Sequence, residues 1–309
     1  MVDQIKKSKS TAQTTGHAWD GDIQEFNNPL PNWWLWGFYA SAVFAIIYWV
    51  FYPSWPVGNS YLKGAFNDIE YVTKDGKTHR THWNTRSLYL KEMQIAREYQ
   101  QKYIDQVNQS SYETITKDQT ISEFVNSKAK VLFADNCAPC HQVGGGGEIG
   151  TYPNLVDDSW LWGGSFTDIQ NTIQQGHVGF MPSFSETLND SQISDVAAYV
   201  LSLSQTSNQA NATAISNGNK IFNGQTGGCF YCHGETATGL KSTGAANLTD
   251  SIWTIANIPA AQTYKDKLSV VKNVISSGVK REMPSWQDRL SPVEIKILSV
   301  YVHELGGGK

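Results

Sequence analysis

The chain has 309 residues and a formal net charge of −4, and hydrophobic residues make up 40% of it. This length is enough for two or three domains. The net charge is slightly negative, and no basic stretch is interleaved with aromatic residues. We therefore do not expect a nucleic acid as a partner.

The first strong signal along the chain is a membrane helix at residues 33–52. These 20 residues carry no charge, and a helix of that length spans the roughly 30 Å hydrocarbon core of a bilayer. A buried core helix is the alternative, but no other segment is hydrophobic enough to pack around it. A cleaved signal peptide is disfavoured because the apolar run is too long and starts too late. Aromatic side chains at both ends resemble interfacial belts: Trp33, Trp34 and Trp36 at one end, Tyr48, Trp49, Tyr52 and Trp55 at the other.

The segments on either side of this helix are polar. Residues 1–32 form a head, and residues 53–120 form a stalk or docking segment with a predicted helix at residues 87–107. His79 and His82 lie three residues apart in the stalk, but no carboxylate or Cys stands in register with them. We interpret both as solvated side chains and not as a metal site, and the sequence assigns no role to His17.

All four cysteines fall in two Cys-x-x-Cys-His motifs, Cys137–His141 and Cys229–His233. A lone Cys-x-x-Cys also occurs in redox-active thiol pairs and in zinc sites, but two copies that are each followed by His are typical of c-type haem attachment. The motifs predict two haem c groups, bound covalently through Cys137, Cys140, Cys229 and Cys232, with His141 and His233 as axial iron ligands. Haem c is attached outside the cytoplasm, so we expect residues 53–309 outside and the head inside.

The chain repeats itself after residue 120. Asn-Leu followed five residues later by Trp, and Met-Pro followed by Leu and Tyr at fixed intervals, occur once after each haem motif. The paired positions are Asn154 and Asn247, Trp160 and Trp253, Met181 and Met283, Leu188 and Leu290, and Tyr199 and Tyr301.

Met181 and Met283 stand at matching repeat positions, and each follows a haem motif. We predict that they are the second axial iron ligands. Met/His ligation raises the reduction potential and leaves no open position for oxygen. A methionine that only fills a gap in the core is the alternative. His177 could compete as a ligand, but its counterpart in the second copy is Val279, which favours a loop role.

Two further features near the motifs have competing interpretations. The glycines at residues 144–147 are not followed by Lys-Ser or Lys-Thr, so a loop that covers the haem edge is favoured over a phosphate-binding loop. Arg281 lies two residues before Met283 and is equally suited to a haem propionate or to solvent. His303, on the last predicted helix, is interpreted as structural.

Each repeat is expected to begin with a short helix, at residues 123–135 and 214–222, and to close with another. Asn189 with Gln192, and Ser291 with Glu294, read as capping boxes for the closing helices, and Pro292 suits the first helical position. The predicted fold is mainly α, with one N-terminal transmembrane helix followed by two class I cytochrome c-like domains at residues 121–205 and 206–309. The first is strongly acidic, with nine acidic and two basic side chains.

The head, anchor and first repeat resemble the dihaem subunit, subunit III of the CcoP/FixP family, of cbb3-type cytochrome c oxidases. The motifs that carry this resemblance are Gly16-His17-Ala18-Trp19-Asp20-Gly21, Asn28-Pro29-Leu30-Pro31, Tyr52-Pro53-Ser54-Trp55-Pro56, Tyr152-Pro153-Asn154-Leu155 and Trp160-Leu161-Trp162-Gly163-Gly164. The chain departs from the family at Gln142, where a Gly is usual, and at residues 254–256, where Gly-Gly is usual after the aromatic residue. These departures lie at the expected haem-edge surfaces.

The resemblance implies a non-catalytic electron-transfer subunit. It would pass electrons from a soluble or membrane cytochrome c donor to the monohaem and catalytic subunits of an oxidase that reduces oxygen and pumps protons. It implies a single-pass protein of the bacterial inner membrane with periplasmic haem domains. A dihaem subunit of a membrane dehydrogenase or reductase is the alternative, and a dihaem peroxidase, which needs an open iron position, is a second.

Overall fold

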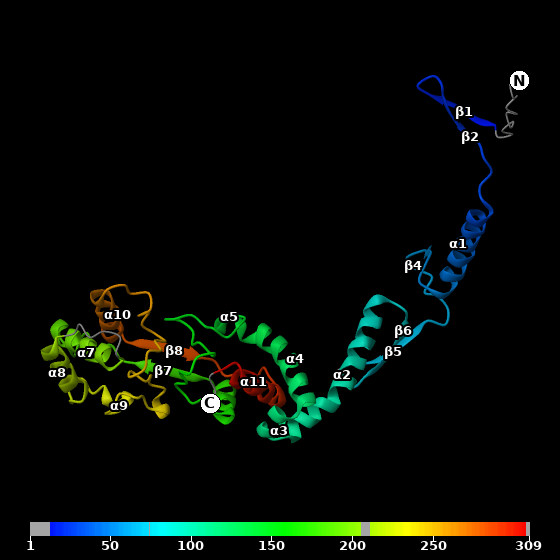
Figure 1. Cartoon of the computed structure of the whole chain (residues 1–309). Coiled ribbons are helices and arrows are strands. Elements are labelled where there is room, and N and C mark those ends of the chain that lie inside the picture. Colours follow the sequence, from blue (N-terminus) through cyan, green and yellow to red (C-terminus); the bar gives the residue numbers. More distant parts are fainter. Residues whose placement is uncertain (1–12, 74, 205–210, 307–309) are drawn as a thin grey trace, which may run out of the picture. The chain divides into compact units, whose positions relative to one another are not determined.

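The computed structural model describes residues 13–73, 75–204 and 211–306 (Figure 1). It contains two compact units, Met1–Gln100 and Gln101–Lys309. The expected boundary between the cytochrome domains, at residues 205–206, and the first 12 residues of the expected head lie outside the described residues.

The first unit contains the predicted membrane helix. Helix α1 (Asn32–Phe51) follows Pro31, and none of its residues is buried, as expected for a helix that faces lipid. It is preceded by an antiparallel hairpin of β1 (Thr14–Trp19) and β2 (Ile23–Phe26). Two further hairpins follow, β3 (Pro56–Val57) with β4 (Ser60–Tyr61), and β5 (Asp68–Val72) with β6 (Thr78–His82). Helix α2 (Thr85–Gln109) confirms the helix expected in the stalk.

The second unit is mainly helical, as predicted. Helix α4 starts at an Asp118 N-cap and α7 at the predicted Asn189–Gln192 capping box, while α11 has the predicted Ser291–Glu294 box with Pro292 in its first turn. The helices are α3 (Tyr112–Lys117), α4 (Gln119–Asn136), α5 (Ala138–His141), α6 (Phe166–Gln175), α7 (Asp190–Leu203), α8 (Ala212–Phe222), α9 (Phe230–His233), η1 (Lys241–Thr243), α10 (Tyr264–Ser277) and α11 (Pro292–Glu304).

Sequence analysis missed four elements that shape this unit. Helices α6 and α10 each begin with a capping box, Ser165 with Asp168 and Thr263 with Asp266, so their start signals were present. The other two are strands β7 (His177–Met181) and β8 (Val279–Met283), which pair antiparallel and are called the ribbon below. Their sequences do not alternate in polarity, and among the described strands each pairs only with the other.

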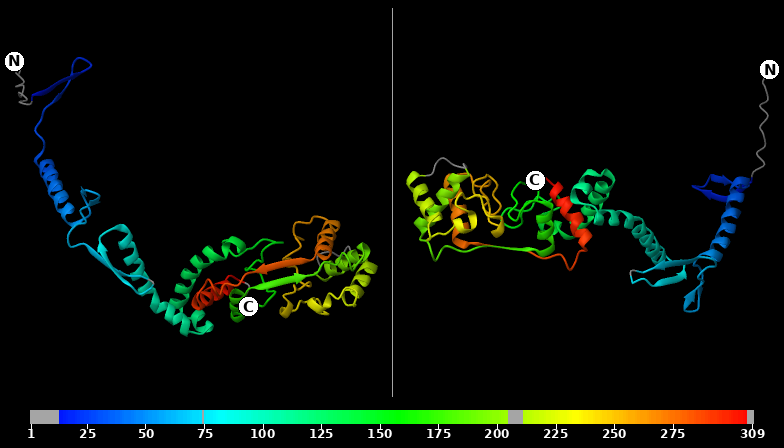
Figure 2. Two further views of the ribbon diagram at one scale, coloured as in Figure 1. Left: turned by 180° about the vertical axis from the view of Figure 1, so that it is seen from behind. Right: turned by 90° about the horizontal axis from the view of Figure 1, so that it is seen from below.

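The closing helices pack in an unexpected way. Each repeat was expected to close on its own helix, but α7 packs on α8 and α10, and α11 packs on α4 and α6. Figures 1 and 2 show α7 beside α8 and α10 at one end of the ribbon, and α11 beside α4 at the other. The two repeats therefore exchange their C-terminal segments, and the cores mix residues of both halves. One core joins Leu201 of α7 to Phe222 and Ile275, and another joins Leu298 of α11 to Phe133 and Ile173.

The ribbon is the physical cause of this exchange. In its register His177 faces Met283 and Met181 faces Val279, so each strand carries its methionine and its helix across to the other half. Gly176 and Gly278 immediately precede the strands and have positive φ. A Cβ on Gly176 would overlap the Met283 main-chain oxygen, and a Cβ on Gly278 would overlap that of Met181. Beyond the strands, the Phe184 amide donates to the Ile275 oxygen at 3.1 Å, and the Trp286 amide donates to the Ile173 oxygen at 3.1 Å.

The turns that carry the two haem motifs end in the same backbone conformation. Gly234 follows His233 with φ 76° and ψ 160°, and Gln142 follows His141 with φ 64° and ψ 164°. This region is essentially restricted to glycine and costs other residues of order 1–3 kcal/mol. Gln142 is therefore strained, whereas Gly234 at the equivalent position of the second motif is not.

We expect Gln142→Gly to stabilise the protein by about 1–3 kcal/mol, because it removes this backbone strain. The full chain should unfold at a higher denaturant concentration, with an unchanged dependence on denaturant. The matched control is Gly234→Gln, which should destabilise the protein by a similar amount. Equal stability of Gln142→Gly and the parent chain would contradict this assignment.

Candidate functional site

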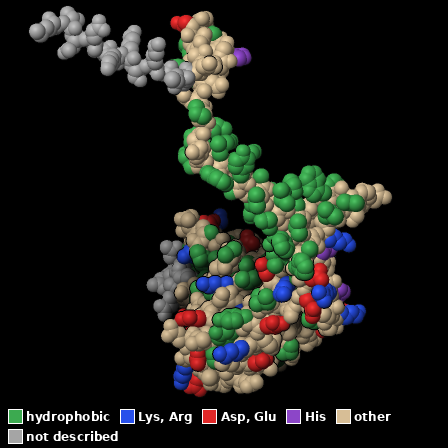
Figure 3. Space-filling view, turned by 90° about the vertical axis from the view of Figure 1, so that its right-hand side faces the viewer, with side chains coloured by type: hydrophobic (Ala, Val, Ile, Leu, Met, Phe, Trp, Pro, Cys, Tyr) green, Lys and Arg blue, Asp and Glu red, His purple; other side chains and the backbone are tan. Residues whose placement is uncertain are grey.

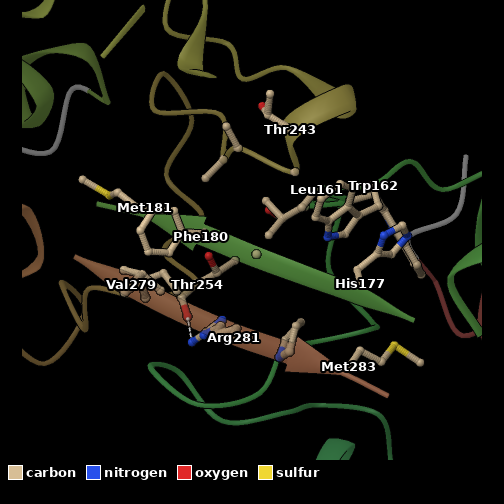
Figure 4. A pocket seen from close by; sticks show the side chains of 18 of the residues that line it. Leu161, Trp162, His177, Phe180, Met181, Thr243, Thr254, Val279, Arg281 and Met283 are labelled. Atoms are coloured by element: carbon tan, nitrogen blue, oxygen red, sulfur yellow. Dashed lines mark hydrogen bonds between the residues drawn. The ribbon is translucent and has the colours of Figure 1, made fainter. Parts of the chain in front are cut away.

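Both Cys-x-x-Cys-His motifs line one continuous cavity in the second unit. Its volume is about 910 Å³. The ribbon crosses it, with Met181 and Met283 at opposite ends (Figure 4). The lining is mostly apolar and comes from both halves of the sequence, including Phe133, Leu155, Phe222 and Leu248. Such a lining suits a large, flat, apolar group with a few polar contacts.

A single helical turn presents each motif to this cavity. The His141 amide donates to the Cys137 oxygen, and the His233 amide donates to the Cys229 oxygen, both at 2.9 Å. In a helical turn, residues three and four positions apart share a face. The two sulfur atoms and the imidazole of each motif are therefore brought to one side, as a haem held by two thioether bonds and ligated at its iron requires.

The two histidines are held in the same way at equivalent repeat positions. His141 Nδ1 lies 3.1 Å from the Pro153 oxygen, and His233 Nδ1 lies 2.9 Å from the Ala246 oxygen. A carbonyl only accepts hydrogen bonds, so Nδ1 donates and Nε2 keeps its lone pair for a metal. Burial lowers the pKa of both imidazoles, against a smaller opposing effect of the carbonyls. Both side chains are thus kept neutral, as an iron ligand must be.

The first cysteine of each motif is buried in an apolar environment. Burial raises the pKa of the Cys137 thiol to about 11 and that of the Cys229 thiol to about 11. Reactive or metal-binding cysteines instead need a depressed pKa. This environment disfavours a catalytic thiol pair or a zinc site and suits a neutral sulfur in a thioether.

The structure brings each methionine to the haem motif of the other repeat. Met181 packs against the same buried core as Cys229 and Phe230, and Met283 packs against the same buried core as Cys137 and Ala138. The sequence order, in which Met181 follows the first motif, suggested the opposite association. The two alternatives have identical sequence patterns because the repeats match, so only the ribbon distinguishes them.

Several buried nitrogen atoms in the cavity have no hydrogen-bond acceptor among the described residues. They are Trp160 Nε1, Trp253 Nε1, and Nε and Nη1 of Arg281. Buried donors without partners are costly and rare, so their gathering at one cavity indicates a missing acceptor, and carboxylate groups are the acceptors that best match Arg. Haem carries two propionates, so these residues fit it.

Arg281 itself is a cavity residue and not a solvent-facing one. Its Nη2 donates to the Thr254 oxygen at 3.1 Å, and Figure 4 shows it on the ribbon near the middle of the site. Burial lowers the pKa of the guanidinium, which nevertheless stays protonated at neutral pH. Trp160 and Trp253 had appeared only as repeat markers, although a Trp recurring at a fixed distance from each Asn-Leu pair was a signal that could have identified them as site residues.

His177 has partners other than a metal. Its ring stacks on Trp162 with centroids 4.0 Å apart and planes 2° apart, and its Nε2 lies 3.0 Å from Thr172 Oγ1. Lys241 from the second repeat pairs with Asp168 at 2.6 Å in the same region, and a Cβ on Gly244 would overlap the Trp162 ring. The Trp162 loop therefore joins the two halves.

The remaining histidines are not among the residues that line the cavity. His79 stacks on Tyr71, and His82 Nε2 lies 3.0 Å from the Tyr61 hydroxyl. His303 stacks on Phe166 at 3.8 Å, and His17 is exposed on β1 beside Trp19. Among the described residues no three His, Cys, Asp or Glu side chains form a metal site.

The glycine loop at residues 144–147 packs beside the first motif. The Gly147 amide donates to the His141 oxygen at 2.9 Å. A Cβ on Gly147 would overlap the Pro153 oxygen, which is the acceptor for the His141 ring. The glycines therefore let this loop approach the carbonyl that orients the histidine.

Two family models match the chain. Residues 11–59 match the N-terminal domain of cytochrome oxidase-cbb3, FixP, and residues 126–200 and 213–302 match cytochrome c oxidase, cbb3-type, subunit III. The cytochrome model implies haem c as the cofactor. The membrane oxidase family and the apolar helix α1, which is long enough to span a bilayer, together indicate a membrane-anchored protein.

Curated relatives match over nearly the whole length. The Cbb3-type cytochrome c oxidase subunit FixP of Azorhizobium caulinodans is 41% identical over 304 residues, covering 96% of this chain and 94% of the relative. The subunit CcoP of Azospirillum brasilense is 36% identical over 100% of both chains, and that of Cereibacter sphaeroides is 34% identical over 100% of this chain and 99% of the relative. The chain belongs to the FixP/CcoP family, subunit III of cbb3-type cytochrome c oxidases.

Proposed function

We propose that this protein relays electrons within a cbb3-type oxidase through two covalently attached haem c groups. The observation that carries this proposal is the pairing, in one cavity, of each Cys-x-x-Cys-His turn with a methionine delivered by the ribbon. Haem c, when bound, supplies an iron that reversibly gains and loses one electron.

The exchanged packing supports crossed ligand pairs. His141 would pair with Met283 at the haem of Cys137 and Cys140, and His233 would pair with Met181 at the haem of Cys229 and Cys232. Arg281, Trp160 and Trp253 would hold the propionates through their unpaired donors. Residues 121–205 and residues 206–309 each supply one haem motif. The closing helix of each site, however, comes from the other of these two ranges.

The side chains around the cavity favour electron transfer over catalysis. Pro153 and Ala246 fix the histidine rings, which limits movement of the ligands when the charge at the iron changes. A methionine ligand in addition to each histidine would leave no iron position for peroxide or oxygen. We therefore infer that the chain has no catalysis of its own and that oxygen chemistry occurs in the catalytic subunit.

The partners follow from this position in an oxidase. A cytochrome c donor would reduce the protein, and the monohaem and catalytic subunits would accept its electrons. The head would lie in the cytoplasm and the haem sites in the periplasm of a bacterial inner membrane, because haem c is attached on that side. Purification of the native complex tests the assignment, and recovery with a dehydrogenase, without haem b or copper, would contradict it.

The first haem site is more acidic than the second, also when the exchanged C-terminal segments are assigned to the sites that they complete. Residues 121–180 hold six acidic and two basic side chains, whereas residues 182–282 hold seven of each. Glu148 and Asp158 are exposed and follow the first motif in the sequence, and Glu235 is exposed two residues after the second motif. Opposite charges accelerate encounter at low salt, so a donor with a basic face would dock at the first site.

We expect Met181→His to lower the potential of the haem at Cys229 and Cys232, because a second histidine stabilises the oxidised iron more than a thioether does. The shift should be a clear fraction of the roughly 0.8 V range that axial ligands span. Redox titration in a Cys137→Ser/Cys140→Ser background, which retains only the second haem, measures it directly.

Met283→His in the same background is the matched control and should leave that potential unchanged. In a Cys229→Ser/Cys232→Ser background the two substitutions should exchange their effects. A shift in the haem potential caused by Met283→His in the first background would contradict crossed ligation. If neither substitution shifted the potential in either background, neither methionine would be an iron ligand.

We expect Glu148→Gln with Asp158→Asn to slow reduction by a basic cytochrome c a few-fold at low salt, because it weakens electrostatic steering. The rate should also depend less on ionic strength. Stopped-flow reduction of the membrane complex checks this, and Glu235→Gln serves as the matched control with an unchanged rate. An equal loss in the control would show that docking does not favour the first site.

A further inference from the structure

The chain that follows the membrane helix carries an exposed apolar surface. Between Pro53 and Asn67 the only charged side chain is that of Lys63. Phe66 is 97% exposed. Four other large apolar or aromatic side chains of this segment are also exposed: Trp55, Val57, Tyr61 and Leu62. A contiguous exposed surface of this kind marks an interaction site.

This segment folds back onto the end of α1. The last four carbonyls of a helix have no partner within it. Here the Tyr52 amide donates to the Tyr48 oxygen at 2.9 Å, and the Ser54 hydroxyl donates to the Trp49 oxygen at 3.1 Å. The remaining two carbonyls are met from further along the chain, by the Ala65 amide on the Val50 oxygen at 2.9 Å and by Asn67 Nδ2 on the Phe51 oxygen at 2.8 Å.

A close backbone approach and two aromatic contacts also hold this segment against the end of α1. Gly64 has φ +83°, and a Cβ there would overlap the Phe51 oxygen, so only glycine permits this close approach. Trp55 packs edge-on against Trp49 with ring centroids 4.9 Å apart, and Phe66 lies 6.5 Å from Phe51. Figure 1 draws β4 beside the end of α1, and Figure 3 shows hydrophobic side chains over this part of the molecule.

We propose that residues 53–67 form a lipid-embedded collar that seats the end of α1 in the outer leaflet of the membrane. Lipid is the occupant that the observations favour, for two reasons. The apolar surface is continuous with that of the membrane helix, and it combines Trp and Tyr with a single Lys, as interfacial segments do. In addition, every terminal carbonyl of α1 is satisfied within the protein, which is what a helix end needs where water is scarce.

The collar ends at Asn67, where the surface changes character. The next hairpin, β5–β6, carries Asp68 and Arg80, which form an exposed ion pair at 2.9 Å. Exposed charges of both signs place this hairpin in water. The boundary between lipid and water therefore lies about 15 residues beyond the end of α1 along the chain.

Site-specific photocrosslinking in native membranes tests the collar. Benzoylphenylalanine is placed at Phe66, at Leu62 and, as a matched exposed control, at Thr78 of β6, in the full chain within its complex. After illumination, mass spectrometry of the protein identifies the adducts. We expect phospholipid adducts at positions 62 and 66 with a yield several-fold above that at position 78.

Two outcomes would overturn the proposal. Crosslinks from positions 62 and 66 to another polypeptide would make this surface a subunit interface, and lipid yields equal to those at position 78 would place the segment in water. The proposal rests on membrane anchoring by α1 and, for the choice of leaflet, on the proposed orientation of the chain, but not on the electron relay. Haem potentials or donor rates that contradict the relay would leave the lipid adducts unchanged.

Discussion

The pairing of β7 with β8 is the interaction on which the rest of the haem-binding unit depends. These are two five-residue strands, yet they set which methionine packs on which core and which helix completes that core. The pairing brings together residues about 100 positions apart, so its loop-closure entropy is large. That cost is offset by the burial of α7 and α11, whose inward side chains would otherwise face water.

Local signals in the sequence were sufficient for much of the fold. The capping boxes at Asn189 and Ser291, the uncharged run at residues 33–52 and the two haem motifs all depend on residues close together in the chain. The exchange of helices could not be predicted in this way, because it depends on which of two similar packing arrangements of α7 and α11 has the lower free energy. Ile193 and Ile295 occupy the same face of matching helices, so either core accepts either helix, and periodicity carries no information about the choice.

The candidate site was predictable to a similar degree. Histidine and cysteine positions follow from the motif, whereas the unpaired donors of Trp160, Trp253 and Arg281 become evident only when burial and hydrogen-bond partners are known. In the sequence, Arg281 was equally suited to a haem propionate or to solvent. Its contact with Thr254 inside the cavity favours the propionate. The strain at Gln142 was likewise not visible in the sequence, because it is the backbone angle and not the residue type alone that makes it costly.

The exchange also has consequences for biogenesis. The first motif lies at residues 137–141, but the helix that closes its core ends at Glu304, so synthesis of the chain completes this motif long before the walls of its cavity exist. Synthesis of the motif and burial of its side chains are thereby separated in time. The same topology joins both halves in a single cooperative unit of high contact order, so proteolysis in the linker between the repeats would not release two independent cytochromes.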